Sequence, residues 1–213
     1  MHDLLLAYLK AVLAVFVILS PFSNIPIVVS LTDGLDAARR NGIVNRAHLM
    51  ALGVCVAFGV AGELIFQFFN ITIGAFRIAG GILLFIMSQS MLYGESPRQK
   101  ISPQDEAEAR AKADVAITPL GTPMIAGPGT IATVMSLMDQ ARGWSEKSLT
   151  LAALPAAVFA SWVLVRFGAP LTVRLGPMGL RVLTRMMGLI LAVIAVQFII
   201  NGAHDALPQI LRK

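Results

Sequence analysis

The sequence predicts an all-α polytopic membrane protein with about six transmembrane helices, arranged as two inverted repeats of three helices each. Of its 213 residues, 56% are hydrophobic and only 14% are charged, whereas soluble domains carry about 25% charged residues. Six separate apolar stretches each come close to the ~20 residues that a helix needs to cross a bilayer. The second half of the chain also resembles the first. Together these three observations exclude a single water-soluble core.

The six apolar stretches follow one another with short polar connections. Their approximate ranges are 4–31, 47–69, 71–91, 115–138, 149–167 and 183–203. Only Asn70 and the turn around it separate the second stretch from the third, which predicts a tight helical hairpin. The first stretch has no basic region before it and no small-residue cleavage site after it. We therefore expect a retained span rather than a signal peptide.

The longest polar segment divides the chain near its middle. It contains Ser102 followed by Pro103, a combination typical of a helix N-terminus. We expect three parts: residues 1–93 as the first three-helix repeat, residues 94–114 as a cytoplasmic linker, and residues 115–213 as the second three-helix repeat.

The basic residues indicate the orientation. The chain has 17 Lys and Arg against 12 Asp and Glu, but the basic residues lie in short gaps between apolar stretches and form no stripe with interleaved aromatics. This distribution argues against nucleic acid as a partner and fits membrane topology. Most of the basic residues fall on one face, and basic connections stay in the cytoplasm. We therefore expect both termini outside the cytoplasm.

The sequence contains few residues that could support catalysis or bind a cofactor. Cys55 is the only cysteine, and the three histidines share no ligand spacing with it or with one another. We therefore expect neither a metal site nor a cofactor. Glu63 is the only acidic residue inside an apolar stretch, whereas an enzyme embedded in the bilayer needs a nucleophile, a metal cluster or paired carboxylates. We expect no catalytic residues.

An internal repeat is the most informative feature. A shift of 108 residues places the third stretch on the sixth, with polar and small residues matching as well as aliphatic ones. The matched pairs include Arg77 with Arg185, Gly80 with Gly188, and Gln89 with Gln197. Because each half contains three spans, an odd number, the second half must enter the membrane from the opposite side, which makes the repeat an inverted one.

Two proline-rich segments occupy corresponding places in the first and fourth stretches. Residues 20–26 read Ser-Pro-Phe-Ser-Asn-Ile-Pro, and residues 118–123 read Thr-Pro-Leu-Gly-Thr-Pro. Proline cannot donate a backbone hydrogen bond, and its ring crowds the carbonyl four residues before it. We expect helices 1 and 4 to be broken near mid-membrane, where non-helical backbone persists only if it is buried in protein or lines a cavity. The alternative is a pair of packed proline kinks without a cavity.

The broken segments supply the candidate substrate site. A half-helix N-terminus offers N–H groups to a carboxylate, and released carbonyls accept from an ammonium group. Neither segment has a charged side chain, so the pattern favours a small neutral or zwitterionic solute. The predicted substrate-binding residues are Ser20, Pro21, Ser23, Asn24, Pro26, Thr118, Pro119, Gly121, Thr122, Pro123, Gly127, Pro128, Gly129 and Thr130.

Two ionisable residues lie inside the predicted hairpin. Glu63 and Arg77 are each seven residues from Asn70, so an antiparallel hairpin places them at the same depth, about 10 Å from the turn at 1.5 Å per residue. We expect them to pair. The pair is either structural or a site of proton coupling, in which Glu63 carries the proton and Arg77 tunes its affinity.

Several of these segments resemble a known family. Residues 117–131, Ile-Thr-Pro-Leu-Gly-Thr-Pro-Met-Ile-Ala-Gly-Pro-Gly-Thr-Ile, resemble the signature segment of the MarC family of bacterial inner-membrane proteins. Residues 20–26, 77–81, 185–188 and 197–199 also match its pattern, and the resemblance covers nearly the whole chain. It implies six spans in the bacterial inner (plasma) membrane and a distant relationship to amino-acid exporters of the lysine-exporter superfamily. The family is classed among neutral amino-acid transporters.

The sequence therefore favours a secondary transporter that works by alternating access, with amino acids as candidate solutes. Its expected partners are the lipid bilayer, the solute and a coupling ion, either a proton or sodium. The chain contains no nucleotide-binding loop of the Walker type. The alternative is a non-transporting membrane protein of the cell envelope or the stress response, in which the proline segments are packed kinks.

Overall fold

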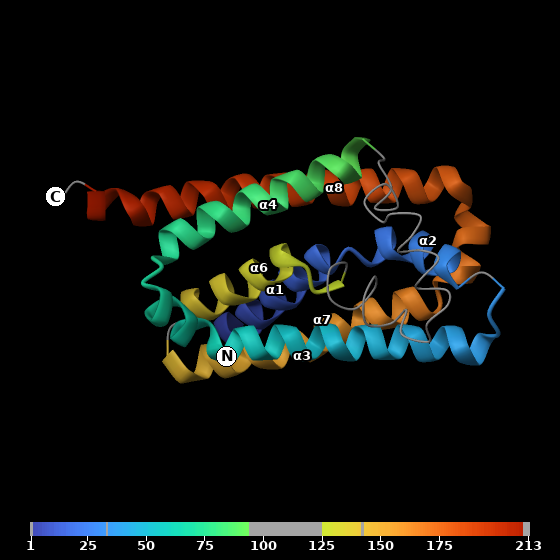
Figure 1. Cartoon of the computed structure of the whole chain (residues 1–213), viewed down its shortest axis with the longest axis horizontal. Helices are drawn as coiled ribbons and strands as arrows, with labels where there is room; N and C mark the ends of the chain where they lie inside the picture. The colour runs from blue at the N-terminus through green and yellow to red at the C-terminus, as the bar shows by residue number, and fades with distance from the viewer. Residues whose placement is uncertain (1, 33, 94–124, 142, 211–213) are drawn as a thin grey trace.

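The computed structural model describes residues 2–32, 34–93, 125–141 and 143–210 (Figure 1). All regular structure in these ranges is helical. The helices are α1 His2–Leu19, α2 Pro21–Leu31, α3 Ala37–Phe69, α4 Ile73–Tyr93, α6 Pro128–Gln140, α7 Gly143–Arg166 and α8 Gly168–Ile210. The predicted linker, residues 94–114, lies outside the described residues.

Five segments of the described chain are long and apolar enough to cross a membrane. They are Leu4–Val29, Ala37–Phe69, Ile73–Tyr93, Gly143–Arg166 and Met178–Leu207. The predicted fourth span, residues 115–138, is described only from Ile125 onward, and its helix α6 has 13 residues. The all-helical class with several long apolar helices is confirmed for the described residues, with five candidate spans there rather than six.

The first apolar stretch consists of two helices. α1 ends at Leu19 and α2 begins at Pro21, while Ser20 between them has a φ of 47°. That value lies in the left-handed region, which a residue with a side chain rarely adopts. Pro21 has no backbone N–H to continue the α1 hydrogen-bond pattern. The first helix therefore ends at Leu19, and a second helix begins at Pro21.

Helix α3 begins ten residues earlier than the expected second span. The carboxylate of Asp36 caps its N-terminus by accepting a hydrogen bond from the backbone N–H of Arg39 at 2.7 Å. The basic residues Arg39, Arg40 and Arg46, which the sequence placed in a connection, therefore lie on the helix. With 33 residues, α3 is about 50 Å long at 1.5 Å per residue.

The turn at Asn70 is tight, but the two helices it joins separate. Asn70 ends α3 in the left-handed conformation with a φ of 52°. From there α4 runs along α8, whereas α3 packs against α6 and α7 (Figure 1). The prediction of a hairpin with packed helices is therefore wrong, although the predicted turn is present.

Glycine allows α4 and α8 to approach closely. A Cβ atom on Gly74 would lie 2.8 Å from the carbonyl oxygen of Gly202, and one on Gly202 would lie 2.7 Å from that of Gly74. Further along, a Cβ on Gly81 would lie 2.8 Å from the carbonyl oxygen of Ala195. Since real Cβ contacts are never this short, the two backbones meet only because these residues have no side chain.

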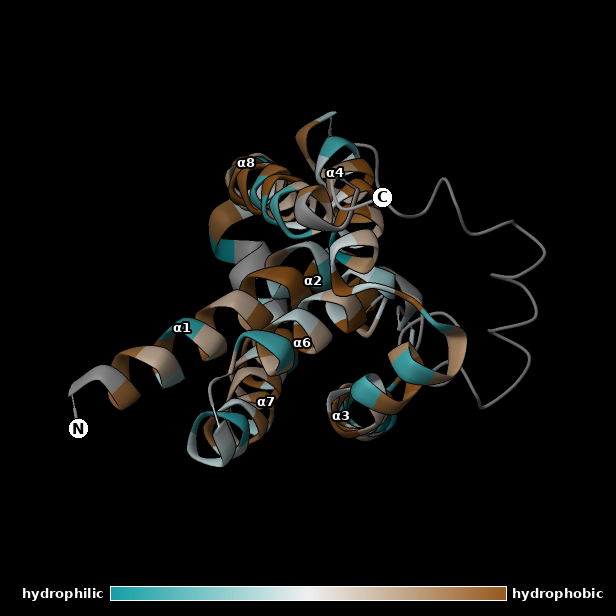
Figure 2. Ribbon diagram, turned by 90° about the vertical axis from the view of Figure 1, so that its left-hand side faces the viewer, coloured by the Kyte–Doolittle hydropathy of each residue, from teal (hydrophilic) through white to brown (hydrophobic). Residues whose placement is uncertain are grey.

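The surface is apolar where the helices face outward. Leu83 and Phe85 of α4 and Leu189 and Val193 of α8 are exposed, while Leu191 between them is buried. In Figure 2 much of the ribbon of α4 and α8 is brown, the colour of hydrophobic residues. Buried serines and threonines lie in the interior. This distribution suits a protein whose helices face lipid.

Candidate functional site

The start of α2 carries a side-chain substitute for a lost backbone hydrogen bond. In a continuous helix the carbonyl of Leu19 would accept from the N–H of Ser23. Here the N–H groups of Ser23 and Asn24 both donate to the carbonyl of Ser20, at 3.0 and 3.2 Å. The side-chain amide of Asn24 donates to the carbonyl of Leu19 instead, at 2.9 Å. The interruption is therefore satisfied by a residue of the following helix.

The start of α6 uses the same device. Gly127 is extended, with φ −68° and ψ 174°, and Pro128 is the first helical residue. The N–H of Thr130 donates to the carbonyl of Gly127 at 2.9 Å. The hydroxyl of Thr130 donates to the carbonyl of Ile125 at 3.2 Å. In both helices a buried polar side chain in the first turn thus binds the carbonyl five residues before it.

The two helix starts lie against the same stretch of α4. The hydroxyl of Ser20 is 3.9 Å from the sulfur of Met91. A Cβ atom on Gly129 would lie 2.5 Å from Leu84 and 3.2 Å from the sulfur of Met87. Leu84, Met87 and Met91 are spaced three and four residues apart, so they share one face of the helix. The starts of α2 and α6 therefore contact the same face of α4, within two helical turns of each other.

Among the described residues, one hydroxyl at this place has no hydrogen-bond partner. Ser23 is only 9% exposed, and its Oγ atom makes no hydrogen bond to any described residue. A buried hydroxyl without a partner costs free energy, so native structures keep few of them. The N-terminal ends of α2 and α6 also carry partial positive charge. The arrangement can therefore bind a small group that accepts hydrogen bonds.

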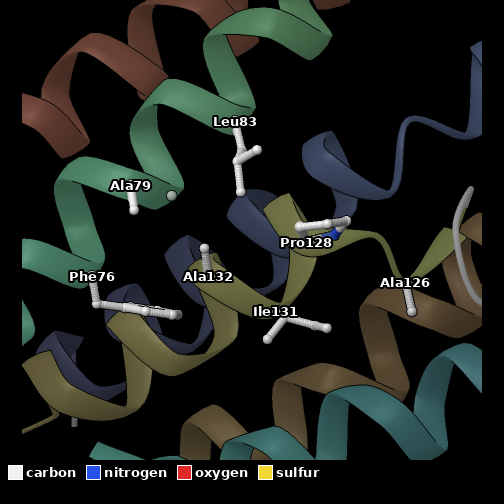
Figure 3. A pocket seen from close by; sticks show the side chains of 8 residues that line it. Phe76, Ala79, Leu83, Ala126, Pro128, Ile131 and Ala132 are labelled. Atoms are coloured by element: carbon white, nitrogen blue, oxygen red, sulfur yellow. The ribbon is translucent and has the colours of Figure 1, made fainter. Parts of the chain in front are cut away.

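An apolar cavity of about 480 Å³ adjoins the start of α6. It lies between α4 and α6, and Figure 3 shows the side chains of both helices around it. It is lined by Phe76, Ala79, Gly80 and Leu83 of α4, by Pro128, Ile131 and Ala132 of α6, and by Ala126, which precedes α6. Because Pro128 is the first residue of α6, the cavity reaches the N-terminus of that helix.

The structure places eight of the predicted substrate-binding residues at these two helix starts. They are Ser20, Pro21, Ser23 and Asn24 at α2, and Gly127, Pro128, Gly129 and Thr130 at α6. Pro26 lies farther along α2 and is exposed. The remaining predicted residues, Thr118, Pro119, Gly121, Thr122 and Pro123, lie outside the described residues.

The expected Glu63–Arg77 pair does not form. Arg77 is 8% exposed and makes three other contacts: Nη1 donates to Asp205, Nη2 donates to Asp139 at 2.8 Å, and Nε donates to the hydroxyl of Ser136 at 3.2 Å. The side chain of Glu63 is 72% exposed and pairs with Lys147 at 3.3 Å. The prediction is wrong because equal depth does not fix which way two diverging helices face.

Sequence reasoning missed Asp139 and Asp205 because they lie just beyond the predicted ends of the fourth and sixth stretches. A topological signal was available. Even-numbered spans end on the membrane face where the third span begins, so both aspartates belong on the same side as Arg77. Both aspartates lie near the ends of their helices, and Arg77 lies four residues after the start of α4. The three residues could therefore have been expected close to the same membrane face.

A second polar contact joins α3 to α7. His48 is buried, with Nδ1 2.9 Å from the carbonyl of Val44 and Nε2 3.3 Å from the hydroxyl of Ser161. A carbonyl only accepts, so Nδ1 carries the proton and Nε2 accepts from the serine in the neutral ring. The histidine thus ties two helices within the core.

Comparison with known proteins decides the family. The family described as MarC family integral membrane protein matches residues 5–207. The chain belongs to the MarC family. Its relatives include the UPF0056 membrane protein YvbG of Bacillus subtilis (strain 168), which is 38% identical over 92% of this chain and 93% of the relative.

Two further relatives of this MarC-family chain match over nearly their whole length. The UPF0056 membrane protein MJ1677 of Methanocaldococcus jannaschii is 36% identical over 94% of this chain and 97% of the relative. The UPF0056 membrane protein YhcE of Escherichia coli (strain K12) is 32% identical over 96% and 95% respectively. No solved structure matches the chain significantly. This MarC-family chain is accordingly a multi-pass integral membrane protein.

Proposed function

We propose that this MarC-family protein is a secondary transporter that moves a small neutral or zwitterionic solute by alternating access, with amino acids as the first solutes to test. The observation that carries the proposal is the pair of helix starts at Pro21 and Pro128, which both lie against one stretch of α4. In secondary transporters, interrupted helices form the substrate site near the bilayer midplane, where two repeats meet.

The chemistry of the two helix starts suits a zwitterion. Their partial positive charge and the hydroxyl of Ser23 favour a carboxylate. The carbonyls of Val17 and Ile18, to which the hydroxyl of Ser20 donates at 3.0 and 3.3 Å, favour a donor such as an ammonium group. Residues 20–26 and 125–131 contain no charged side chain, so a solute with net charge finds no counter-charge there.

Helix packing supports an inverted repeat of three plus three spans. We count α1 and α2 as the first span, α3 and α4 as the second and third, α6 as the second part of the fourth, and α7 and α8 as the fifth and sixth. Exchanging the halves turns the contact of α2 with α7 into that of α6 with α3. It also turns the contact of α2 with α8 into that of α6 with α4. All four contacts are present.

The spacing of the helix starts supports the same repeat. Pro128 follows Pro21 by 107 residues, close to the shift of 108 residues that relates Arg77 to Arg185. The halves then comprise residues 1–93 and 115–213. We further propose that the protein lies in the inner membrane with both termini outside the cytoplasm, on the basis of the basic connections.

The proposal is tested by uptake and counterflow of a labelled amino-acid panel in proteoliposomes, with proton and sodium gradients imposed separately. We expect Asn24→Ala and Thr130→Ala to reduce flux, because each removes the side chain that completes a helix start. Matched controls are Asn201→Ala, which loses only a contact with Gln197, and Thr150→Ala, which loses only a contact with the carbonyl of Glu146.

Flux above that of empty liposomes, lowered by the two site variants and kept by both controls, supports the transporter. If no solute in the panel moves faster than in empty liposomes, the proposal fails in favour of a non-transporting membrane protein. If the site variants and the controls show equal flux, the two helix starts are not the substrate-binding site.

A further inference from the structure

The side chain of Arg77 joins the two proposed halves of the molecule. Arg77 belongs to α4, in the first half, and its guanidinium donates to Asp139 of α6 and Asp205 of α8, both in the second half. Ser136 of α6 accepts from the same guanidinium. These residues lie where α6 and α8 end and α4 begins, at the end of the molecule near Asn70 (Figure 1). We call Arg77, Asp139 and Asp205 the Arg77 cluster.

The Arg77 cluster has unequal charge. One guanidinium faces two carboxylates, which leaves one net negative charge in a place where Arg77 is largely withdrawn from water. A purely structural tie needs only one carboxylate, and the side chains of Asp139 and Asp205, which are 27% and 35% exposed, are partly withdrawn from the water that stabilises an unpaired charge. Burial raises the pKa of Asp139, and the neighbouring carboxylate of Asp205 adds to the rise while Arg77 opposes it.

Among the residues that the structure describes, the charged groups around the cluster do not cancel the surplus. Lys147 of α7 faces it but also pairs with Glu63 of α3, so these two offset each other. His204 of α8 has its Nδ1 4.0 Å from Asp205, and its side chain is almost fully exposed. Glu146, next to Lys147, has interactions of its own. Gln140 is neutral and donates to the hydroxyl of Ser136.

We propose that the Arg77 cluster is a proton-operated latch between the two halves, so that the coupling ion of the proposed transporter is a proton that binds to the Asp139–Asp205 pair. This inference rests on the proposed function for its role in transport. It replaces the sequence-based hypothesis that Glu63 carries the proton, because Glu63 is exposed and lies outside the cluster.

The latch works by simple charge balance. A proton from the adjacent aqueous phase binds to one carboxylate oxygen and yields a neutral carboxylic acid, so the net charge of the cluster changes from one negative to zero. The neutral acid no longer attracts the guanidinium as an ion. Arg77 then makes one ion pair to the second half instead of two, with its hydrogen bond to Ser136 of α6 still present, and this weaker tie lets the halves separate at this end. Loss of the proton restores both ion pairs.

The test measures opening directly and needs no transported solute. A reporter cysteine replaces Thr133, which is 2% exposed and lies one turn farther inside α6 than Ser136. The buried native thiol is removed by Cys55→Ala. The protein is placed in lipid nanodiscs, and a water-soluble methanethiosulfonate reagent labels the reporter. Each rate is divided by that of Trp144→Cys, a residue that is 90% exposed, at the same pH.

We expect the normalised labelling rate to rise about tenfold or more from about pH 8 to about pH 5, which corresponds to about 1.4 kcal/mol. Asp139→Asn and Asp205→Asn should each label fast already at the higher pH, with a flattened pH response. The matched control His204→Gln should keep the response of the parent protein, because it changes a neighbouring group without touching Arg77.

Three results would overturn the latch. They are a pH-independent reporter in the parent protein, a full pH response in both aspartate variants, and loss of the response in His204→Gln. A response to sodium at constant pH in place of the pH response would assign a different ion. If an aspartate variant does not fold, as judged by size-exclusion chromatography, Asp139→Glu replaces it and should keep the response.

This experiment separates the two proposals. A pH-dependent reporter together with no flux of any solute leaves the latch standing and removes the transporter. If a solute is transported but the labelling rate of the reporter does not depend on pH, the proposal of a transporter holds and the proposal of the latch is wrong.

Discussion

The side-chain amide of Asn24 takes the place of the backbone donor that the carbonyl of Leu19 lacks, at a distance of 2.9 Å. The interruption between α1 and α2 therefore leaves no orphaned carbonyl at Leu19, even though both residues are buried. Thr130 does the same for Ile125 at the start of α6. A side chain that completes a broken helix can release its carbonyl to a ligand without unfolding the backbone.

Asn24→Ala should lower the free energy of unfolding by about 1–3 kcal/mol, because it leaves the buried carbonyl of Leu19 without a donor. Asn24→Asp should behave similarly at neutral pH, since a carboxylate cannot donate. The measurement is chemical or thermal unfolding in detergent micelles. Asn201→Ala, which breaks only an exposed contact with Gln197, is the control. Equal effects at both positions would contradict a capping role for Asn24.

Ser20→Gly and Ser20→Val should change the free energy of unfolding by different amounts. Ser20 has a φ of 47°, which glycine adopts freely and a β-branched residue does not. The glycine variant loses the hydrogen bond to the carbonyl of Val17, so we expect a change within about 1 kcal/mol. The valine variant should lose about 1–3 kcal/mol from backbone strain. If the Ser20→Val variant has a higher free energy of unfolding than the Ser20→Gly variant, Ser20 does not need this conformation.

The sequence was most informative where chemistry along the chain is local. Pro21 predicts the start of α2, and Pro128 occupies the first position of α6, because proline fits a helix start and disrupts a helix interior. Asn70 likewise predicts the turn after α3. The tie from Asn24 to Leu19 was not predicted, because it depends on the geometry of the interruption.

The sequence did not predict the contacts that depend on the directions in which the helices run. Glu63 and Arg77 have matching depth, but α4 leaves α3 to pack on α8, and depth carries no information about that choice. The glycines that make the choice possible, Gly74 and Gly202, are visible in the sequence. Which helix each one faces becomes clear only in three dimensions.

Gly74→Ala should destabilise the protein by about 1–3 kcal/mol through overpacking, because the added Cβ would lie 2.8 Å from a backbone carbonyl oxygen that cannot move alone. Gly53→Ala is the matched control, since a Cβ there meets nothing within 4 Å and alanine favours the helix by about 1 kcal/mol. Unfolding in micelles should therefore move the two variants in opposite directions. A neutral Gly74→Ala would mean that α4 and α8 are not held at this distance.

Arg77→Gln should be the most damaging single substitution at the end near Asn70. It leaves the partly exposed carboxylates of Asp139 and Asp205 without their shared cation, so we expect a loss of about 1–3 kcal/mol, less than for a fully buried ion pair. Lowering the pH should recover part of this loss, because protonated aspartates no longer repel each other. Glu63→Gln removes only an exposed pair with Lys147, so its effect should stay within about 1 kcal/mol. Both variants are compared by unfolding at neutral and acidic pH. If Arg77→Gln is no worse than Glu63→Gln, or is equally unstable at both pH values, the ion pairs of Arg77 do not hold the three helices together.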